Sequence, residues 1–489
     1  MRHRLYNVLV LSAPAYVSLF IIHLRNSLPS LTAGRVPPDL GNSAGASQTL
    51  QFLHILCLGY LFAVYGLALW SWQRSTLIRR DLAWSAAALT VLACSLLPAD
   101  SSDALQYIGF GRLVAVHHVS PYLHTYSEFT DRFSPYITWD EPMPYGPAVL
   151  PIFAIAGVVS EHDVLIAIYV VKSVWALIHL LNAWLIYRLA RSLTPAPEYA
   201  VFVFAFNPLI LFEQPGNGHN DGLLILCGLL ALLALQRGRE SLALCLALLC
   251  ALVKISGLFW LAGIAAYLIQ QRRWRGLVHG LGASLAAMAG IFTLIPGVTT
   301  LGLMNTQWQF SEDSLHTILI DRAGALFRAL NSTWDYDDLF RLDRLIFSAL
   351  FVGVCVWRLA SIRDIAGLIR EVGHLLLILL LGYAVSVYPW YITWLLPIAA
   401  LTDSGRLRRT ICVASGSVLA LYAFPDALIG QPPVHAIWPA LRLGLAFGVP
   451  MGFWVADGNR QPRASVELVK TMRSSLRSPD NSNKPSRSA

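Results

Sequence analysis

A short polar stretch, QPGNGHND at residues 214–221, separates two long apolar runs of the chain. An earlier stretch, ADSSDALQYIGFG, places Asp100 and Asp103 beside another apolar run. Ionisable groups are expensive inside a lipid bilayer, and those that occur there usually have a function. A carboxylate at the bilayer surface can deprotonate a sugar hydroxyl as a general base. These residue types and positions therefore indicate transfer chemistry at the mouth of a membrane cavity.

Basic side chains follow these acids along the chain. Lys254 lies at the tip of a predicted apolar hairpin, and Arg322 and Arg328 lie in a later polar segment. Acids and bases beside lipid favour transfer of a sugar from a lipid-linked anionic donor through an oxocarbenium-like transition state. A Lys or Arg near the departing phosphate would stabilise its charge. This scheme requires no metal or other cofactor, and the sequence contains no HExxH motif or His and Cys ligand spacing.

The composition indicates which elements must hold these residues. The chain has 489 residues, of which 56% are hydrophobic and 13% are charged, whereas an ordinary soluble domain is about 25% charged. Its mean hydropathy is +0.57, and its apolar runs are long enough for membrane-spanning helices, which need about 20 residues. We predict an all-α polytopic membrane protein. A β-barrel would show short alternating segments, and the sequence has none.

The net charge of +8 does not indicate a nucleic-acid-binding protein. The Arg and Lys residues cluster in short gaps between apolar runs, as the positive-inside rule predicts for cytoplasmic turns. The seven cysteines lie within or beside apolar runs and show no spacing of a disulfide framework or metal site. We interpret them as packing residues.

The apolar runs predict about fourteen transmembrane helices, with both chain ends in the cytoplasm. The first three are placed at residues 5–24, 50–72 and 82–97. The first is interpreted as an uncleaved span rather than a signal peptide, because no clear small-residue cleavage site follows it. Residues 241–270 are predicted to form a hairpin that turns on the outside at Lys254.

Two long segments, residues 100–163 and 296–344, are predicted to lie outside the membrane. The first contains YGPAVLPIFAIAGVVS, an apolar run whose length suits a re-entrant or interfacial helix better than a full span. Residues 457–489 are polar and predict a disordered basic cytoplasmic tail. The predicted organisation is one transmembrane domain, residues 1–456, followed by this tail.

Several of these stretches occur together in one known family. SSDALQYIGFGRLVAVHHVSPY, PYGP, FNPLILFEQPGNGHNDGLL, ALVK and YPWYITWLLPI follow one another between roughly residues 95 and 400. Their order and spacing resemble the GT-C superfamily of membrane glycosyltransferases, in particular the bacterial polyprenol-phosphate-mannose-dependent α-mannosyltransferases. The resemblance implies a GT-C-like helix bundle, a polyprenyl-phosphate-linked donor and mannose as the transferred sugar.

The resemblance also assigns roles to individual residues. Asp103 matches the family's base aspartate, Asp221 matches the acidic residue of the second outer loop, and Lys254 matches a basic residue near the lipid phosphate. The chain departs from the family pattern in two ways. It has two additional predicted spans before Asp103, and His117 and His118 precede VSPY where a Gly-containing turn is usual. The second departure leaves the identity of the sugar open.

Each acidic candidate also has a purely structural interpretation. Asp103 could cap the helix that follows it, because Asp and Ser favour that position. Asn220 and Asp221 could cap the next helix in the same way. Asp100, three residues before Asp103, is the reserve candidate for the base.

The basic and aromatic candidates have structural interpretations as well. Lys254 could extend its ammonium group to the interface without a partner, and Arg322 could pair with an acid of its own loop. Trp390 and Tyr391, in YPWYITW, could belong to an aromatic belt or stack on a sugar or polyprenyl chain. Tyr145, in PYGP, could simply help to shape a cavity wall.

We predict an inverting glycosyltransferase of the cell membrane with its active site on the extracytoplasmic face. It would move a sugar from a polyprenyl-phosphate carrier to a glycolipid or glycan acceptor. Asp103 would be the general base, and Lys254 and Arg322 would bind the donor phosphate. The predicted donor or acceptor pocket consists of Tyr107, Tyr145, His219, Asn220, Asp221, Trp390 and Tyr391.

The alternative prediction is a multi-pass secondary transporter or a lipid-carrier flippase. About fourteen spans would suit a transporter, but transporters place their ionisable groups near the bilayer midplane on broken helices. In this sequence most of the charged candidates lie toward one membrane surface, in two long outer segments. This distribution favours the transferase.

Overall fold

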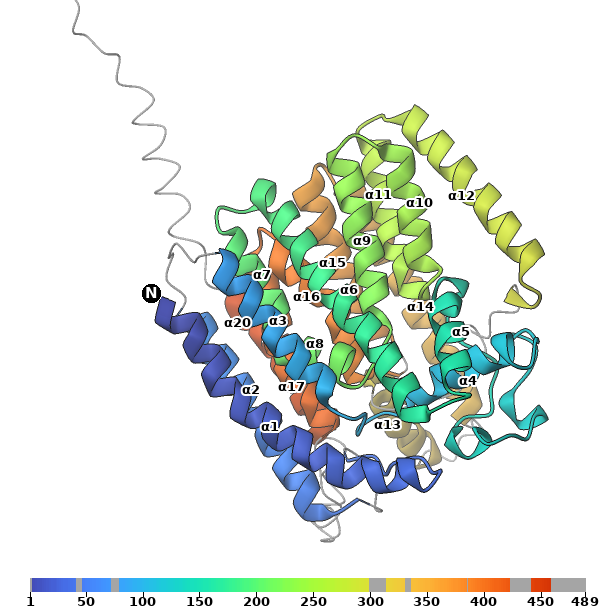
Figure 1. Ribbon diagram of the computed structural model, residues 1–489. Coiled ribbons are helices and arrows are strands. Elements are labelled where there is room, and N and C mark those ends of the chain that lie inside the picture. Colours follow the sequence, from blue (N-terminus) through green and yellow to red (C-terminus); the bar gives the residue numbers. More distant parts are fainter. Residues whose placement is uncertain are drawn as a thin grey trace, which may run out of the picture.

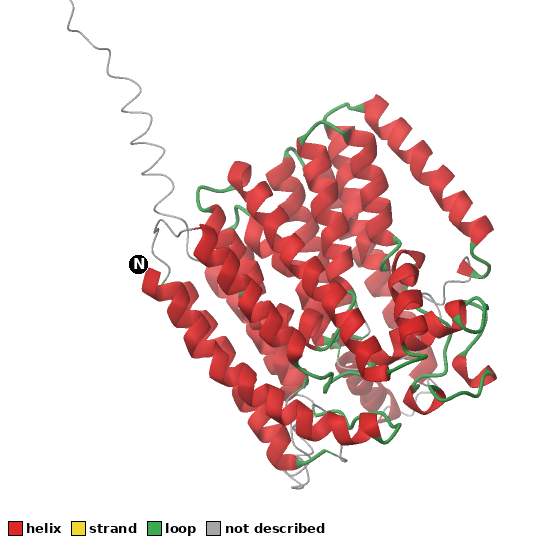
Figure 2. Cartoon of the chain, viewed as in Figure 1, coloured by secondary structure: helices red, strands yellow, loops and turns green. Residues whose placement is uncertain are grey.

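The computed structural model describes residues 2–40, 46–71, 79–298, 314–329, 336–384, 386–422 and 441–458. Within these ranges every regular element is a helix (Figure 2). The predicted tail lies almost entirely outside the described residues. The last helix, α20, continues to Gly458, two residues beyond the boundary placed at 456.

The first half of the chain forms the helices that carry most of the predicted site. They are α1 (Arg2–Thr32), α2 (Gln48–Trp70), α3 (Arg79–Ser95), α4 (Asp103–Ala115), α5 (Leu150–Val159), α6 (Val164–Leu193), α7 (Pro197–Ala205), α8 (Pro208–Leu211) and α9 (Asp221–Gln236).

The second half completes the bundle. Its helices are α10 (Glu240–Ala251), α11 (Leu258–Gln270), α12 (Trp274–Leu294), α13 (Leu315–Ala329), α14 (Tyr336–Ala360), α15 (Ile365–Ile378), α16 (Leu396–Leu401), α17 (Gly405–Ser417) and α20 (Val449–Gly458). In Figure 1, α1 and α2 lie along one edge of the bundle and α12 lies along the opposite edge.

Five helices are long and apolar enough to cross a membrane, and a sixth span results if one bent pair is counted as a unit. The five are Val8–Thr32, Gln48–Trp70, Val164–Leu193, Trp274–Leu294 and Ile365–Tyr383. The protein is therefore a multi-pass membrane protein, as predicted. The described helices do not provide the predicted fourteen full-length spans, because several apolar runs are divided into shorter helices such as Glu240–Ala251 and Ile255–Gln270.

The run YAVFVFAFNPLILFE shows how a predicted span is divided. Helix α7 ends at Ala205, and Asn207 then caps α8 by accepting a hydrogen bond from the Leu209 backbone N–H at 3.0 Å. Pro208 takes the first helical position, where its missing N–H costs nothing. A π-helical turn, Phe212–Gly216, follows, and the chain then bends by 113° into α9. The polar stretch QPGNGHND occupies this bend.

Helix α5 is short, as we predicted from the limited length of the apolar run YGPAVLPIFAIAGVVS. It packs directly on α4. A Cβ atom at Gly111 would collide with the backbone carbonyl of Phe153, and one at Gly157 would collide with the backbone of Gly111. The Tyr107 and Phe153 rings stack at a centroid distance of 4.6 Å. The two glycines thus allow the backbones to touch, and α5 fixes α4 in place.

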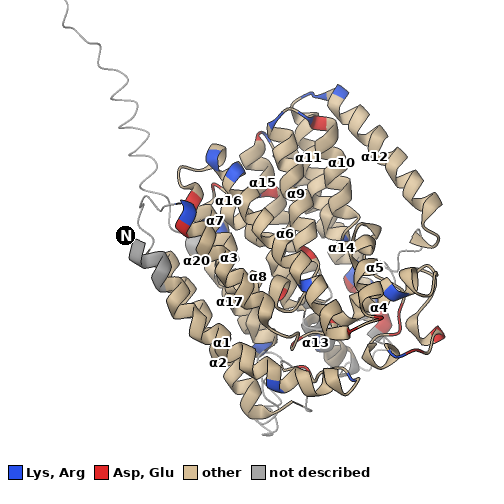
Figure 3. Ribbon diagram, viewed as in Figure 1, with Lys and Arg blue, Asp and Glu red and all other residues tan. Residues whose placement is uncertain are grey.

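The Arg-rich turns that were predicted to lie inside come together at one end of the bundle. Contacts join the turns after α6 and α9, the turns around α10 and α11, and the turns before α15 and α17. These contacts are Gln236 with Ser192, Arg273 with Glu240, Gln271 with Arg363, and Arg370 with Asp403. Figure 3 shows blue basic residues at the end of the bundle where α11 and α12 meet.

Candidate active site

The acidic candidates lie at the other end of the bundle, at the first residues of two helices. Asp103 begins α4 and Asp221 begins α9. Helix α9 has 16 residues, so Asp221 lies about 24 Å from the Arg-rich end that Gln236 joins. Lys254 lies at the tip of the α10–α11 hairpin, as predicted, just before the turn Ile255–Gly257.

The Asp103 carboxylate is buried and accepts hydrogen bonds from several hydroxyl groups. Ser101 Oγ donates to Oδ1 at 3.0 Å, while Tyr107 and Tyr145 donate to Oδ2 at 2.9 and 3.0 Å. Ser102, not Asp103, occupies the position before the first helical residue of α4. The side chain of Asp103 therefore faces these hydroxyls instead of serving as the predicted helix cap.

Burial and the neighbouring Asp103 carboxylate raise the pKa of Tyr107 and of Tyr145 well above the ordinary value. Both phenols consequently keep their protons and act as donors toward Asp103 across the physiological pH range. They restrict Asp103 Oδ2 to one orientation, which is what a positioned general base requires.

His219 connects the bend to Asp103. Its Nε2 lies 3.2 Å from Ser101 Oγ and 3.7 Å from Asp103 Oδ2, and its ring stacks on Trp390 at 4.1 Å. The preceding residue, Gly218, has a φ of +90°, a backbone conformation that favours glycine. This turn brings His219 from the broken helix to the start of α4.

Asp221, Lys254 and Trp394 form a second, adjoining group. Lys254 Nζ lies 2.7 Å from Asp221 Oδ1, and Trp394 Nε1 donates to the same oxygen at 2.5 Å. Lys254 therefore has a buried carboxylate partner rather than an ammonium group that simply extends to the interface. Trp394 was not among the predicted pocket residues.

Aromatic rings surround Lys254 and join the two groups. Its Nζ lies 5.3 Å from the Tyr145 ring centroid, 5.4 Å from that of Tyr391 and 5.8 Å from that of Trp394. Tyr145 thus contacts Lys254 with its ring and Asp103 with its hydroxyl. Trp390 is only 9% exposed and Trp394 only 6%, so they pack inside the bundle instead of forming an aromatic belt toward lipid.

Some polar atoms of this site lack a protein partner. Asn220 precedes α9 and is fully buried, yet within the described part of the chain its side-chain oxygen and nitrogen form no hydrogen bond. The Oδ2 atom of Asp221 is also without a hydrogen-bond partner among the described residues. Asn220 does not act as a side-chain cap, because it forms no capping hydrogen bond. These atoms can form hydrogen bonds with a bound ligand.

The remaining candidates lie elsewhere. Asp100 Oδ2 pairs with His54 Nε2 at 3.0 Å, and His54 Nδ1 lies 3.2 Å from His23 Nε2. The structure therefore ties Asp100 to the first two helices. Arg322 is exposed on α13, while the side chain of Arg328 lies outside the described residues.

A pocket of about 210 Å³ borders the turn before α4. Its polar lining includes Asp39, Ser101, Ser102 and Thr138, and Leu105 contributes part of the apolar lining. Leu105 is two residues after Asp103 and therefore projects from nearly the opposite side of α4. The pocket therefore lies on the side of α4 that faces away from the Asp103 carboxylate. Residues of the loop after α1 line part of its wall.

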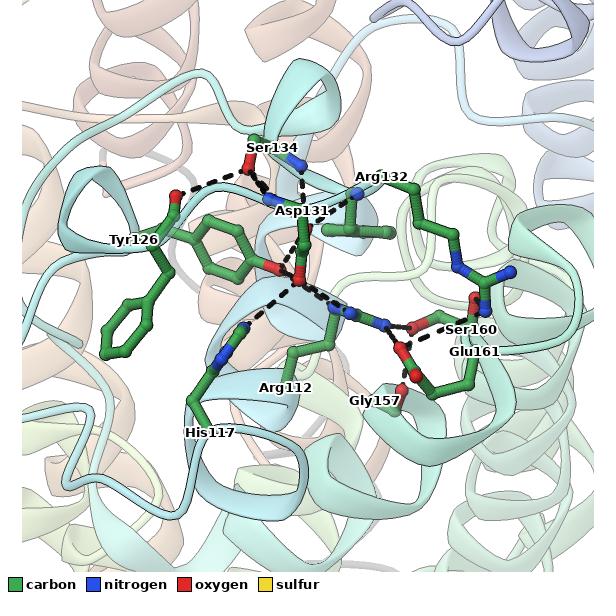
Figure 4. Close-up of polar contacts among 11 residues, drawn as sticks. Arg112, His117, Tyr126, Asp131, Arg132, Ser134, Gly157, Ser160 and Glu161 are labelled. Carbon is green, nitrogen blue, oxygen red and sulfur yellow. Dashed lines mark hydrogen bonds and ion pairs between the residues drawn. The ribbon is translucent and has the colours of Figure 1, made fainter.

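Arg112, a buried residue that was not predicted as part of the site, holds the loop of residues 117–137 and the end of α5 against α4 (Figure 4). Arg112 forms an ion pair with Asp131 at 2.6 Å and another with Glu161, and it donates to Tyr126 and Ser160 at 2.8 and 2.9 Å. These partners are distant in sequence and converge only in the folded chain. The network fixes the loop of residues 117–137 next to α4, the helix that positions Asp103.

We predict that Asp131→Asn loosens the loop of residues 117–137. Burial would raise the pKa of Asp131, but hydrogen bonds from Arg112, the Phe133 N–H and Tyr126 outweigh it and lower the pKa from 3.8 to about 2. The stabilisation is therefore complete above pH 3.8 and is lost as the pH falls through about 2. Removing one partner of a buried ion pair costs roughly 3–5 kcal/mol, and somewhat less here because Asp131 is partly exposed.

Hydrogen exchange in detergent measures this effect. At pH 7, amides of residues 117–137 should exchange faster in Asp131→Asn than in the unmodified protein, while those of α9 should be unchanged. Equal protection of residues 117–137 in both proteins would contradict the proposed tether.

Sequence comparison places the chain in a family. The family described as "Alpha-(1->6)-mannopyranosyltransferase, N-terminal domain" matches residues 25–270, which are 246 of the 489 residues. The chain belongs to this family. The range contains Asp103, Asp221 and Lys254, and it also contains α2 and α3. Two of the three helices that precede Asp103 therefore lie within the region that the family shares.

Individual relatives agree with the family assignment. Alpha-(1->6)-mannopyranosyltransferase A of Mycobacterium tuberculosis is 25% identical over 463 residues, covering 86% of this chain and 86% of the relative. Alpha-(1->6)-mannopyranosyltransferase B of Corynebacterium glutamicum is 23% identical over 355 residues, covering 66% of this chain and 58% of the relative. The predicted resemblance to membrane mannosyltransferases is confirmed, and the enzyme is a mannosyltransferase, a class of hexosyltransferase.

Proposed function

We propose that the enzyme transfers mannose, with inversion, from a polyprenyl-phosphate carrier to a hydroxyl group of a glycan or glycolipid acceptor. The reaction takes place on the extracytoplasmic face of the cell membrane. Asp103 is the general base, and Lys254 binds the donor phosphate. Mannose transfer follows from the family to which the chain belongs. The polyprenyl-phosphate carrier, the inversion at the anomeric carbon and the roles of the residues are proposals.

One observation carries this proposal. A buried carboxylate held by Tyr107 and Tyr145 adjoins a buried lysine held by Asp221, and both groups lie at the bundle end opposite the Arg-rich turns. The positive-inside rule assigns Arg-rich turns to the cytoplasm, so this end belongs to the other face. A base and a cation side by side are what an acceptor hydroxyl and a departing phosphate each need.

In the proposed reaction Asp103 accepts the proton of the acceptor hydroxyl as its oxygen bonds to the anomeric carbon. The bond from that carbon to the phosphate oxygen breaks at the same time, and its electron pair leaves with the polyprenyl phosphate. A single displacement inverts the anomeric carbon, so an α-linked product requires a β-linked donor. General-base catalysis of this kind typically contributes about 10²- to 10⁴-fold.

Lys254 suits the departing phosphate because its ammonium group has three N–H donors. One donor is directed to Asp221 Oδ1, which leaves others for phosphate oxygens. The faces of Tyr145, Tyr391 and Trp394 further stabilise the cation in a site with little water. Arg322 remains a proposed second cation from the later outer segment.

The sugar is proposed to bind beside the bend of the broken helix. Asn220 and Asp221 Oδ2 are buried polar groups without a hydrogen-bond partner in the described residues, and sugar hydroxyls would satisfy them. Trp390, which stacks on His219, would present an aromatic surface to the sugar ring or the lipid chain. The site would thus be complete only when its substrates are bound.

A transfer assay tests the proposal directly. Purified protein in proteoliposomes is given polyprenyl phosphate carrying radiolabelled β-mannose and a mannose-containing glycolipid. We expect labelled α-linked product and release of unlabelled polyprenyl phosphate. Uptake of a solute or movement of the intact carrier across the bilayer, without any glycosylated product, would instead support a transporter or flippase.

A further inference from the structure

A second buried acid lies behind the proposed base. Glu213, in the π-helical turn, is fully buried, and its Oε2 lies 3.0 Å from His219 Nδ1. Tyr422 donates to its Oε1 at 2.8 Å, and Asn217 donates to Oε2 at 3.3 Å. A buried carboxyl group with these partners is held in one position beside His219.

The contacts of His219 determine the protonation of one ring nitrogen. Nδ1 lies 3.2 Å from the Glu213 backbone oxygen, which can only accept a hydrogen bond, and 3.0 Å from the Glu213 carboxylate. Nδ1 must therefore carry a proton. Nε2 is the nitrogen that can change between an acceptor and a donor.

The Ser101 hydroxyl bridges Nε2 to Asp103. The direct distance from Nε2 to Asp103 Oδ2 is 3.7 Å, too long for a hydrogen bond, but Ser101 Oγ is 3.2 Å from Nε2 and 3.0 Å from Asp103 Oδ1. Ser101 carries a single proton, which it can donate to either neighbour. Glu213, His219, Ser101 and Asp103 therefore form one continuous hydrogen-bonded chain.

We propose that Glu213 and His219 return Asp103 to its carboxylate form after each sugar transfer. This inference rests on the proposed function, in which Asp103 takes the acceptor proton. The Asp103 proton moves to Ser101 Oγ while the Ser101 proton moves to His219 Nε2, which yields a carboxylate and an imidazolium ion. Glu213 stabilises the imidazolium ion, which gives its proton to water when the products leave.

Glu213 is a positioning residue in this scheme, since it acts on Asp103 only through His219. Its role concerns the interval between turnovers and not the transfer itself. Loss of Glu213 should therefore leave the first transfer intact and slow the recovery of the base. A purely structural role would impair both phases together.

The experiment compares single-turnover and steady-state kinetics of Glu213→Gln, which keeps the size of the side chain and removes its charge. With enzyme in excess over labelled polyprenyl-phosphate mannose, we expect the transfer rate to stay within about twofold of the unmodified enzyme. With donor in excess, we expect an initial burst of one product per enzyme, followed by turnover about tenfold slower. The slow phase should slow further in deuterated water.

Ser101→Ala provides a second variant, because it removes the bridging hydroxyl without altering Glu213 or His219. We expect the first transfer to slow somewhat, because Asp103 Oδ1 loses the hydrogen bond from Ser101, and steady-state turnover to be slower still. Steady-state turnover as fast as the first transfer would contradict the proposed relay. His54→Gln is the matched control, since it disrupts another buried histidine–carboxylate pair, that of His54 with Asp100. It should show no burst, and a burst in His54→Gln would overturn the proposal.

Two further outcomes separate this inference from the proposed function. If the unmodified enzyme transfers mannose and Glu213→Gln slows both phases equally, or neither phase, the proton-returning role is wrong and the proposed function stands. If the unmodified enzyme makes no product from polyprenyl-phosphate mannose, the proposed function fails and the inference fails with it.

Discussion

Asp103→Asn should abolish mannose transfer while leaving the fold intact. An amide cannot take the acceptor proton, so the transfer rate should fall by about 10²- to 10⁴-fold, the usual contribution of a general base. The amide oxygen still accepts hydrogen bonds from Tyr107 and Tyr145, which now donate to the carboxylate at 2.9 and 3.0 Å. The variant should therefore express normally and bind the labelled donor with unchanged affinity.

Asp100→Asn is the matched comparison for this result. Asp100 is the same type of residue and lies three residues away, but the structure pairs it with His54. We expect a loss of thermal stability with transfer reduced by less than about tenfold. If Asp100→Asn abolished transfer and Asp103→Asn did not, the base would be Asp100 and the assignment of Asp103 would be wrong.

The convergence of Asp103, Asp221 and Lys254 follows from simple features of the sequence. Each residue lies at the end of an apolar run, and the Arg-rich turns define the opposite end of the same runs. Alternation of the runs then places all of these residues at one end of the bundle. No long-range contact had to be known for this prediction, which depends only on charge and hydropathy.

Glu213 was not predicted because its role depends on how a helix is broken. In the sequence it ends an apolar run and marks only the boundary of a span. The π-helical turn, with Pro215, and the 113° bend bring its carboxylate to 3.0 Å from His219 Nδ1. Hydropathy does not record the direction in which a chain leaves such a bend.

The described helices include fewer full-length spans than the fourteen predicted, for a related reason. A hydropathy pattern detects the apolar length of a run, whereas the structure also depends on caps and on prolines within it. The Asn207 cap and Pro208 divide one run, and Lys254 with the turn after it divides another. Apolar helices that pack inside the bundle need not be long enough to cross a bilayer alone.

Lys254→Met should cause the second large loss of activity. Methionine preserves the length and the apolar contacts with the surrounding rings, but it removes the cation. The departing phosphate would lose its main protein partner, and loss of one such group typically lowers the rate by about 10²- to 10³-fold. The loss should appear with the labelled polyprenyl-phosphate donor even when donor is saturating.

The variant also leaves Asp221 without its ion-pair partner, and this effect must be separated from catalysis. Removing one member of a buried pair costs roughly 3–5 kcal/mol, whereas replacing both members can be nearly neutral. The double variant Lys254→Met with Asp221→Asn should therefore recover most of the thermal stability that Lys254→Met loses. Trp394, which donates to Asp221 Oδ1 at 2.5 Å, can also donate to the oxygen of an asparagine.

Activity in the double variant decides what Lys254 does. If the lysine acts on the donor phosphate, the restored fold will still transfer mannose at least 10²-fold more slowly than the unmodified enzyme. If the lysine serves only to neutralise Asp221, transfer will recover together with stability. The second result would show that Lys254 does not bind the donor phosphate. Arg322, in the later predicted outer segment, would then be the next candidate for this role.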